Sequence, residues 1–126
     1  MLFDKLLVES CFFGFGALTI LSLLFNGGIL LWGGNFICML TGMLCHQYQI
    51  KKFYTLDKVV VYVIGLMNII YHHDKMDLIY RILLYILVAV SIYSFHTIKT
   101  QEEHLIFVHV PSYLGIFLII AAQSVN

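Results

Sequence analysis

Long apolar segments alternate with short polar segments along the whole chain. Five of the apolar segments approach the roughly 20 residues that a helix needs to cross a bilayer. We therefore expect transmembrane helices over residues 6–25, 29–46, 57–72, 78–95 and 105–122. The predicted fold is all-α, a polytopic transmembrane helical bundle of about five spans, and residues 1–126 are expected to form a single integral membrane domain.

The polar segments carry the signals that end one span and begin the next. Asn26-Gly27-Gly28 predicts a tight turn, because Asn and Gly readily adopt positive φ. His46 to Leu56 is expected to be a loop, and Asp57 then lies in the first turn of the third helix, where a carboxylate suits the positive end of the helix dipole. His72, His73 and His96 are expected to be loop residues.

Composition supports a membrane protein and excludes a nucleic-acid-binding one. Hydrophobic residues make up 61% of the chain and charged residues 11%, whereas soluble domains carry about 25% charged residues. The mean hydropathy is +0.93. Formal net charge is zero and no basic stripe is present, so nucleic acid is not an expected partner. The expected partner is the lipid bilayer, and the pattern leaves the oligomeric state open.

The three cysteines, Cys11, Cys38 and Cys45, fall inside or at the ends of apolar segments. An odd count without a CxxC pair indicates neither a disulfide framework nor a thiolate metal site. We expect buried, unreactive thiols.

Basic residues are distributed unevenly between the two sides that five spans define. Lys75 and Arg81 fall on one side, and the other five of the seven basic residues fall on the opposite side: Lys5, Lys51, Lys52, Lys58 and Lys99. By the positive-inside rule, the N-terminus is predicted to be cytosolic and the C-terminus to lie on the other side of the membrane.

Ionisable residues recur near that same predicted cytosolic face. One of them lies within or directly beside each expected span: Glu9, His46, Asp57, His96 and His109. An ionisable residue within a membrane segment is a functional-site candidate by default. His109 is the strongest of the set, because it lies in the apolar stretch LIFVHVPSYLGIF and needs a polar partner there.

Simpler structural roles stay open for the other candidates. Glu9 is also suited to the start of a helix, Asp57 to capping its helix and pairing with a lysine, and His46 to an exposed interface. Asn35 and Asn68 are expected to form hydrogen bonds between helices rather than to bind a ligand. Gly33, Gly34 and Gly42 in the second span predict close approach of a neighbouring helix.

Zinc chemistry is one use for these residues. Imidazole nitrogens from separate helices can hold Zn²⁺ and leave one position for a water whose pKa falls toward ~7. We take His46, His109 and His104 as candidate metal ligands, with Asp57 and Glu9 as the catalytic acid/base or supporting carboxylates.

The spacing of His104 and His109 works against a shared metal on a regular helix. Five residues correspond to about 500° of rotation, so the two rings would point about 140° apart. Pro111 offers a way round this, because proline disfavours helix at the preceding Val110 and removes a backbone donor.

The order of these residues resembles a superfamily of membrane metal-dependent hydrolases that includes the alkaline ceramidases, the hemolysin III proteins and the progestin/adiponectin receptors. Glu9-Ser10 with Gly14-Phe15-Gly16-Ala17 is similar to the acidic, small-residue start of that family's first helix. His46 matches the histidine that ends the second helix, and Leu56-Asp57 matches the pair that begins the third. His109 looks like the second histidine of the last helix.

The chain departs from the family pattern at three points. Gly42 stands where the family has serine, four residues before His46, and Leu105 stands four residues before His109, with His104 one position away. About five spans replace the usual seven. What the resemblance implies is a zinc-dependent hydrolase of lipid amide or ester bonds, with a substrate that arrives from the bilayer. His46 and His109 would hold the metal and Asp57 would assist proton transfer.

Two other functions remain open from the sequence. The glycine-containing helices are also suited to a non-enzymatic membrane protein that acts through helix packing or a partner. A b-type haem held by His46 and His109 is the third possibility, because two histidines at similar depth on facing helices would supply its axial ligands.

Overall fold

The described part of the chain is helical and contains no strand. The computed structural model describes residues 2–25, 27–48, 50–97 and 100–125. Five helical segments are long and apolar enough to cross a membrane: Lys5–Leu24, Gly28–Tyr48, Lys51–Lys75, Leu78–Thr97 and Glu102–Gln123. The prediction of an all-α fold with about five spans is confirmed, and these helices are consistent with an integral membrane protein.

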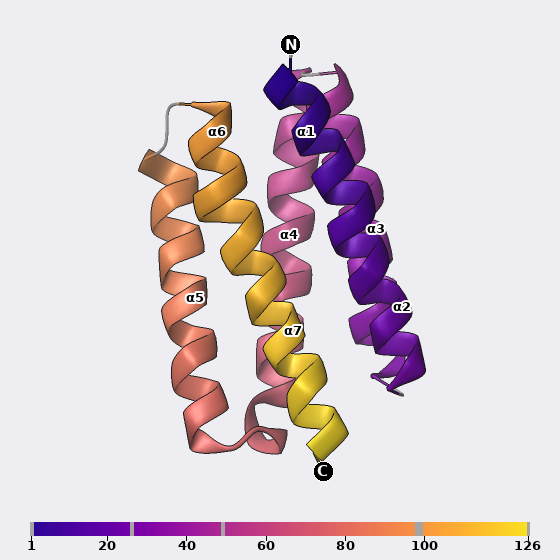
Figure 1. Cartoon of the computed structure of the whole chain (residues 1–126), viewed down its shortest axis with the longest axis vertical. Helices are drawn as coiled ribbons and strands as arrows, with labels where there is room; N and C mark the ends of the chain where they lie inside the picture. The colour runs from indigo at the N-terminus through magenta and orange to yellow at the C-terminus, as the bar shows by residue number, and fades with distance from the viewer. Residues whose placement is uncertain (1, 26, 49, 98–99, 126) are drawn as a thin grey trace. The chain divides into compact units, whose positions relative to one another are not determined.

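Seven α-helices and three short irregular helical stretches follow one another along the described residues (Figure 1). The first span joins α1 (Leu2–Ser10), a π-helical stretch (Cys11–Phe15) and α2 (Gly16–Leu24). The next three spans are α3 (Gly28–Tyr48), α4 (Lys51–His72) and α5 (Leu78–Thr97), and a 3-10 turn (His73–Lys75) follows α4. The last span joins α6 (Gln101–His104), a second π-helical stretch (Leu105–His109) and α7 (Val110–Val125).

The chain divides into two compact units. Unit 1 is Met1–Tyr71 and unit 2 is His72–Asn126. Unit 1 contains the first three spans and unit 2 contains the last two. The expectation from the sequence that residues 1–126 form a single membrane domain stays a prediction.

Glycines of α3 allow neighbouring helices of unit 1 to approach closely. A Cβ added at Gly34 would lie 2.6 Å from the Ile64 side chain on α4, and a Cβ added at Gly42 would lie 2.7 Å from Cys11 Sγ. At either position an added Cβ would force its neighbour to shift. The predicted role of small residues is therefore confirmed at these two positions.

Buried amides link the helices of unit 1 through hydrogen bonds. Asn35 Nδ2 on α3 donates to Ser22 Oγ on α2 at 3.3 Å. Asn68 Nδ2 on α4 donates to the Leu30 carbonyl of α3 at 3.3 Å. These contacts confirm the interhelical role expected for both asparagines.

The turn between the first two spans uses a left-handed glycine, as the sequence predicts. Gly28 has φ of +78°, a value that glycine adopts without steric cost. The Gly27 N–H donates to the Ser22 carbonyl at 2.7 Å and closes the end of α2. Asn26 lies outside the described residues.

The predicted loop from His46 to Leu56 is wrong. Helix α3 continues to Tyr48 and α4 already begins at Lys51, while residue 49 lies outside the described residues. Lysine and leucine favour helix and no glycine or proline interrupts residues 50–58, so polarity alone does not stop the helix. Asp57 therefore lies about two turns inside α4, where the helix dipole has little effect.

The loop assignments of His72 and His96 are also wrong. His72 is the last residue of α4 and is 1% exposed, and His96 lies inside α5. A backbone in a bilayer must satisfy its own hydrogen bonds, so a helix continues through a polar side chain near its end. His73 lies in the 3-10 turn as a connecting residue, and its Nδ1 is 2.6 Å from the Tyr85 hydroxyl.

Unit 2 packs the last span against α5. A Cβ added at Gly115 would lie 3.3 Å from the Leu84 side chain, which is a close helix contact. Ser112 Oγ on α7 donates to Ser91 Oγ on α5 at 3.4 Å. This contact places a polar bond between the two helices at about the level where the second π-helical stretch joins α7.

Candidate metal centre

Unit 1 brings a thiol and an imidazole together from its first two spans. Cys11 begins the π-helical stretch and is 1% exposed, and His46 lies near the end of α3 and is 9% exposed. Their ligand atoms lie within 4.8 Å of each other. Both residues belong to unit 1, so this pair is a property of that unit alone.

Gly42 lies one helical turn before His46 on α3, and the Cys11 and Asp57 side chains lie close to it. A Cβ at Gly42 would meet Cys11 Sγ at 2.7 Å, Cys11 Cβ at 3.5 Å and Asp57 Oδ1 at 3.7 Å. The sulfur and the carboxylate oxygen therefore both approach the α3 backbone at the same residue.

A hydroxyl on α3 fixes the Asp57 carboxylate. Thr41 Oγ1 donates to Asp57 Oδ1 at 3.0 Å, and Asp57 is half-buried. The structure thus gives Asp57 a partner on the neighbouring helix in unit 1, beside Gly42. This position follows from its place inside α4 and not from the helix-start role that the sequence suggested.

In unit 2, the π-helical stretch changes the relation between His104 and His109. The ring centroids of the two histidines lie 4.8 Å apart, with the rings edge to face at 72°. A π-helix closes its hydrogen bonds from i to i+5, so residues five apart lie nearly one above the other. The expected separation of about 140° held for a regular α-helix and is wrong for this stretch.

Tyr113 contacts His109 from the following turn of the helix. Its hydroxyl lies 3.4 Å from His109 Nδ1 in a hydrogen bond, and the ring centroids are 5.8 Å apart. His109 itself is 6% exposed. His104 also contacts Phe95 of α5, with ring centroids 5.8 Å apart. His109 is thus oriented by one neighbour before it in the helix and one after it.

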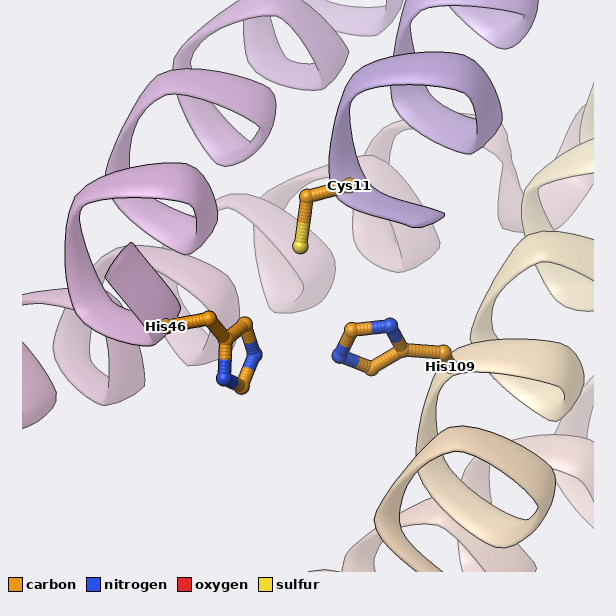
Figure 2. Close-up of side chains that lie close together, drawn as sticks. All are labelled: Cys11, His46 and His109. Carbon is orange, nitrogen blue, oxygen red and sulfur yellow. The ribbon is translucent and has the colours of Figure 1, made fainter. Parts of the chain in front are cut away.

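Within unit 1, the buried Cys11 sulfur and the buried His46 ring each offer one ligand atom that could hold a metal ion, and these two atoms lie within 4.8 Å of each other (Figure 2). His109, in unit 2, is a buried imidazole that could offer a further ligand atom. His46 and His109 are the two ligands that the sequence favoured. His104, also in unit 2, packs against the His109 ring.

The remaining candidates are placed differently. Glu9 Oε1 lies 3.9 Å from Lys5 Nζ, one turn back on α1, and the Glu9 side chain is 45% exposed. The catalytic roles of Glu9 and Asp57 stay predictions.

Sequence reasoning missed Cys11 as a possible ligand. The absence of a CxxC pair led us to expect an inert thiol, yet one thiolate combined with histidines from other spans needs no such pair. Depth in the membrane was the signal that could have found it. Cys11 is two residues beyond Glu9 and, in an antiparallel hairpin, falls at about the level of His46.

Comparisons with known proteins supply no relative. No family model matches the chain, and the searches of curated proteins and of solved structures return no match. The superfamily resemblance therefore stays a prediction, and the function is argued from the site.

Proposed function

We propose that this chain is a multi-pass membrane metalloprotein, with Zn²⁺ as its metal, that hydrolyses an amide or ester bond of a lipid. The observation that carries the proposal is the buried Cys11 and His46 pair of unit 1, in helices apolar enough to cross a membrane. We take the buried His109 of unit 2 as the third ligand. The residue order that resembles membrane metal-dependent hydrolases supports the reaction class.

The donor set fits zinc. One sulfur and two imidazole nitrogens are common zinc ligands, and Zn–S and Zn–N bonds of ~2.0–2.3 Å put tetrahedral donors roughly 3.5 Å apart. The ligand atoms of Cys11 and His46 lie within 4.8 Å of each other, which is compatible with small side-chain movements on binding. Three protein ligands leave a fourth position open, which is the pattern of catalytic rather than structural zinc sites.

Zinc bound here would supply Lewis acidity and make water a nucleophile at neutral pH. The chain's own residues would do the rest. Asp57 would accept and return a proton as general base and acid, and the Thr41 hydroxyl would keep its carboxylate in one orientation. Tyr113 would orient the His109 ring by accepting the N–H of the nitrogen that does not bind metal.

The membrane-length helices support a lipid as the substrate. The candidate ligands belong to membrane-length helices, so a substrate that partitions into the bilayer reaches them without crossing water. The uneven distribution of lysines supports a cytosolic N-terminus and a site near the cytosolic face.

Metal content tests the first half of the proposal. Elemental mass spectrometry of the detergent-purified full chain is expected to find one zinc per chain, and His46→Ala and His109→Ala are each expected to lose it. His96→Ala, on the unit 2 helix α5, is the matched control and should keep the metal. A protein without bound metal would sink the proposal, and a Soret band in its visible spectrum would favour haem instead.

Hydrolysis tests the second half. Asp57→Asn is expected to lower turnover of a lipid amide or ester by about 10²- to 10⁴-fold while zinc stays bound. Asp74→Asn, in the turn after α4, should leave turnover unchanged. Stoichiometric zinc without turnover of either lipid class would refute the hydrolase and leave a non-enzymatic metal-binding protein.

A further inference from the structure

We propose that Gly42 sets the metal preference of this site. Because it has no side chain, the Cys11 sulfur occupies the space beside it, and the metal is bound through a thiolate. The site would then select thiophilic divalent ions such as Zn²⁺, Co²⁺ and Cd²⁺ over the oxygen-preferring Mg²⁺, Mn²⁺ and Ca²⁺. This inference rests on the proposed metal site and names the class of ion that it takes.

Gly42 and Cys11 both belong to unit 1. A Cβ at Gly42 would lie 2.7 Å from Cys11 Sγ, closer than real Cβ atoms approach any neighbour. The sulfur is the end of a side chain with a single χ angle, so it could yield only by leaving its rotamer or by a shift of the helix. Cys11 is 1% exposed, and a close-packed interior offers little space for another rotamer.

The displaced sulfur would be the one that lies near His46. Cys11 Sγ and the His46 ring nitrogen belong to the same candidate ligand group, within 4.8 Å. Any movement of Cys11 away from Gly42 changes that separation. A side chain at position 42 therefore acts on metal binding through Cys11, without contacting the metal.

Sulfur ligation determines the ion class. Thiolates favour zinc and other soft or borderline ions, whereas carboxylate, carbonyl and water oxygens suit Mg²⁺, Ca²⁺ and Mn²⁺. In the described residues the candidate group takes its sulfur from Cys11, while Cys38 and Cys45 are buried elsewhere on α3 and do not belong to it. Replacing those two cysteines therefore provides matched controls.

Cobalt provides a readout that does not depend on activity. Metal-free full-length protein in detergent is titrated with Co²⁺, and the near-ultraviolet sulfur-to-cobalt charge-transfer band is recorded with the visible d–d bands. Wild type, Cys38→Ser and Cys45→Ser are expected to show both. Cys11→Ser is expected to lose the sulfur band. Mg²⁺ and Mn²⁺ in large excess should not displace cobalt from the wild type.

Gly42→Ala is the decisive variant. It is expected to weaken cobalt affinity by about 10- to 100-fold, the usual effect of disturbing residues that support a metal ligand, and to lose most of the sulfur band. Gly65→Ala is the matched control on α4, where an added Cβ meets nothing within 4 Å, and it should bind cobalt like the wild type.

A double variant separates this effect from misfolding. Gly42→Ala is expected to lower Tm, and Cys11→Ala/Gly42→Ala to recover the Tm of Cys11→Ala. With the sulfur gone, the new Cβ meets Cβ of residue 11 at 3.5 Å, an ordinary contact. Failure of the double variant to recover would overturn the steric link.

The outcomes also separate this inference from the proposed function. Cobalt bound by the wild type without a sulfur band, or a wild-type band in Gly42→Ala, would overturn the inference and leave a histidine metal site standing. No binding of cobalt or zinc by the wild type would overturn both.

Discussion

Two π-helical stretches interrupt two different spans, and the candidate metal ligand in each is positioned by different neighbours. Cys11–Phe15 lies in the first span, in unit 1, and Leu105–His109 lies in the last span, in unit 2. Each has a candidate metal ligand at one end: Cys11 begins the first and His109 ends the second. Single-turn π-helices inside α-helices are frequent at functional sites.

The two stretches differ in their surroundings. The second is followed closely by Pro111, which has no N–H to continue an α-helical ladder, so a change in hydrogen bonding before it has a cause in the sequence. The first has no proline after it, and its Cys11 instead packs against Gly42 of α3. Contacts with a neighbouring helix thus place Cys11, whereas residues on its own helix place His109.

The largest expected effect separates a ligand from its neighbour on the second stretch. His109→Ala should remove the bound zinc, whereas His104→Ala should weaken zinc binding only by about tenfold, because His104 supports the ring without ligating the metal. Zinc affinity measured by competition with a chelating dye distinguishes the two. Equal losses in both variants would make His104 a ligand.

A change of helix register should have the next largest effect. Pro111→Ala restores a backbone donor and allows a regular α-helix, in which His104 and His109 would separate by about 140°. Zinc affinity is expected to fall by about tenfold. Deleting Phe107 as well shortens the spacing to four residues, which aligns the two rings on an α-helix and should restore affinity. No recovery in the double change would break the proposed link between the π-helical stretch and the site.

Removing one hydroxyl should have a smaller effect. Tyr113→Phe deletes the hydrogen bond to His109 Nδ1, and zinc affinity is expected to fall by about tenfold or less. Tyr85→Phe is the control within unit 2, because the Tyr85 hydroxyl bonds His73 rather than a candidate ligand. A Tyr113→Phe protein with wild-type affinity would show that ring packing alone orients His109.

The smallest expected effect concerns stability. Asn35→Ala removes the hydrogen bond to Ser22 between α2 and α3, and such bonds in membrane proteins average about 0.6 kcal/mol. Unfolding in mixed micelles should show a loss of that order in the free energy of unfolding. A loss of several kcal/mol would mean that Asn35 does more than join two helices.

The sequence predicted the features that depend on apolar length and on single residue types. The five spans, the left-handed Gly28 and the hydrogen bonds of Asn35 and Asn68 follow from local rules that hold wherever a chain meets a bilayer. His46 and His109 are buried, as an imidazole with a partner in an apolar segment would be, and their role as metal ligands stays a prediction.

The features that the sequence did not predict depend on contacts with other parts of the chain or on irregular helix geometry. Polarity suggested a loop from His46 to Leu56, yet those residue types continue a helix. The alignment of His104 with His109 depends on a π-helical stretch that a regular period cannot anticipate. Cys11 became a candidate because its sulfur lies near His46, thirty-five positions later in the sequence.

The most direct test of the metal centre is zinc-edge X-ray absorption on the detergent-purified full chain. If the proposed zinc site exists, we expect one sulfur at about 2.3 Å and two imidazole nitrogens at about 2.0 Å from the zinc, with the sulfur lost in Cys11→Ser and one imidazole lost in His109→Ala. A shell made only of oxygen ligands, or a protein that carries no zinc, would contradict it.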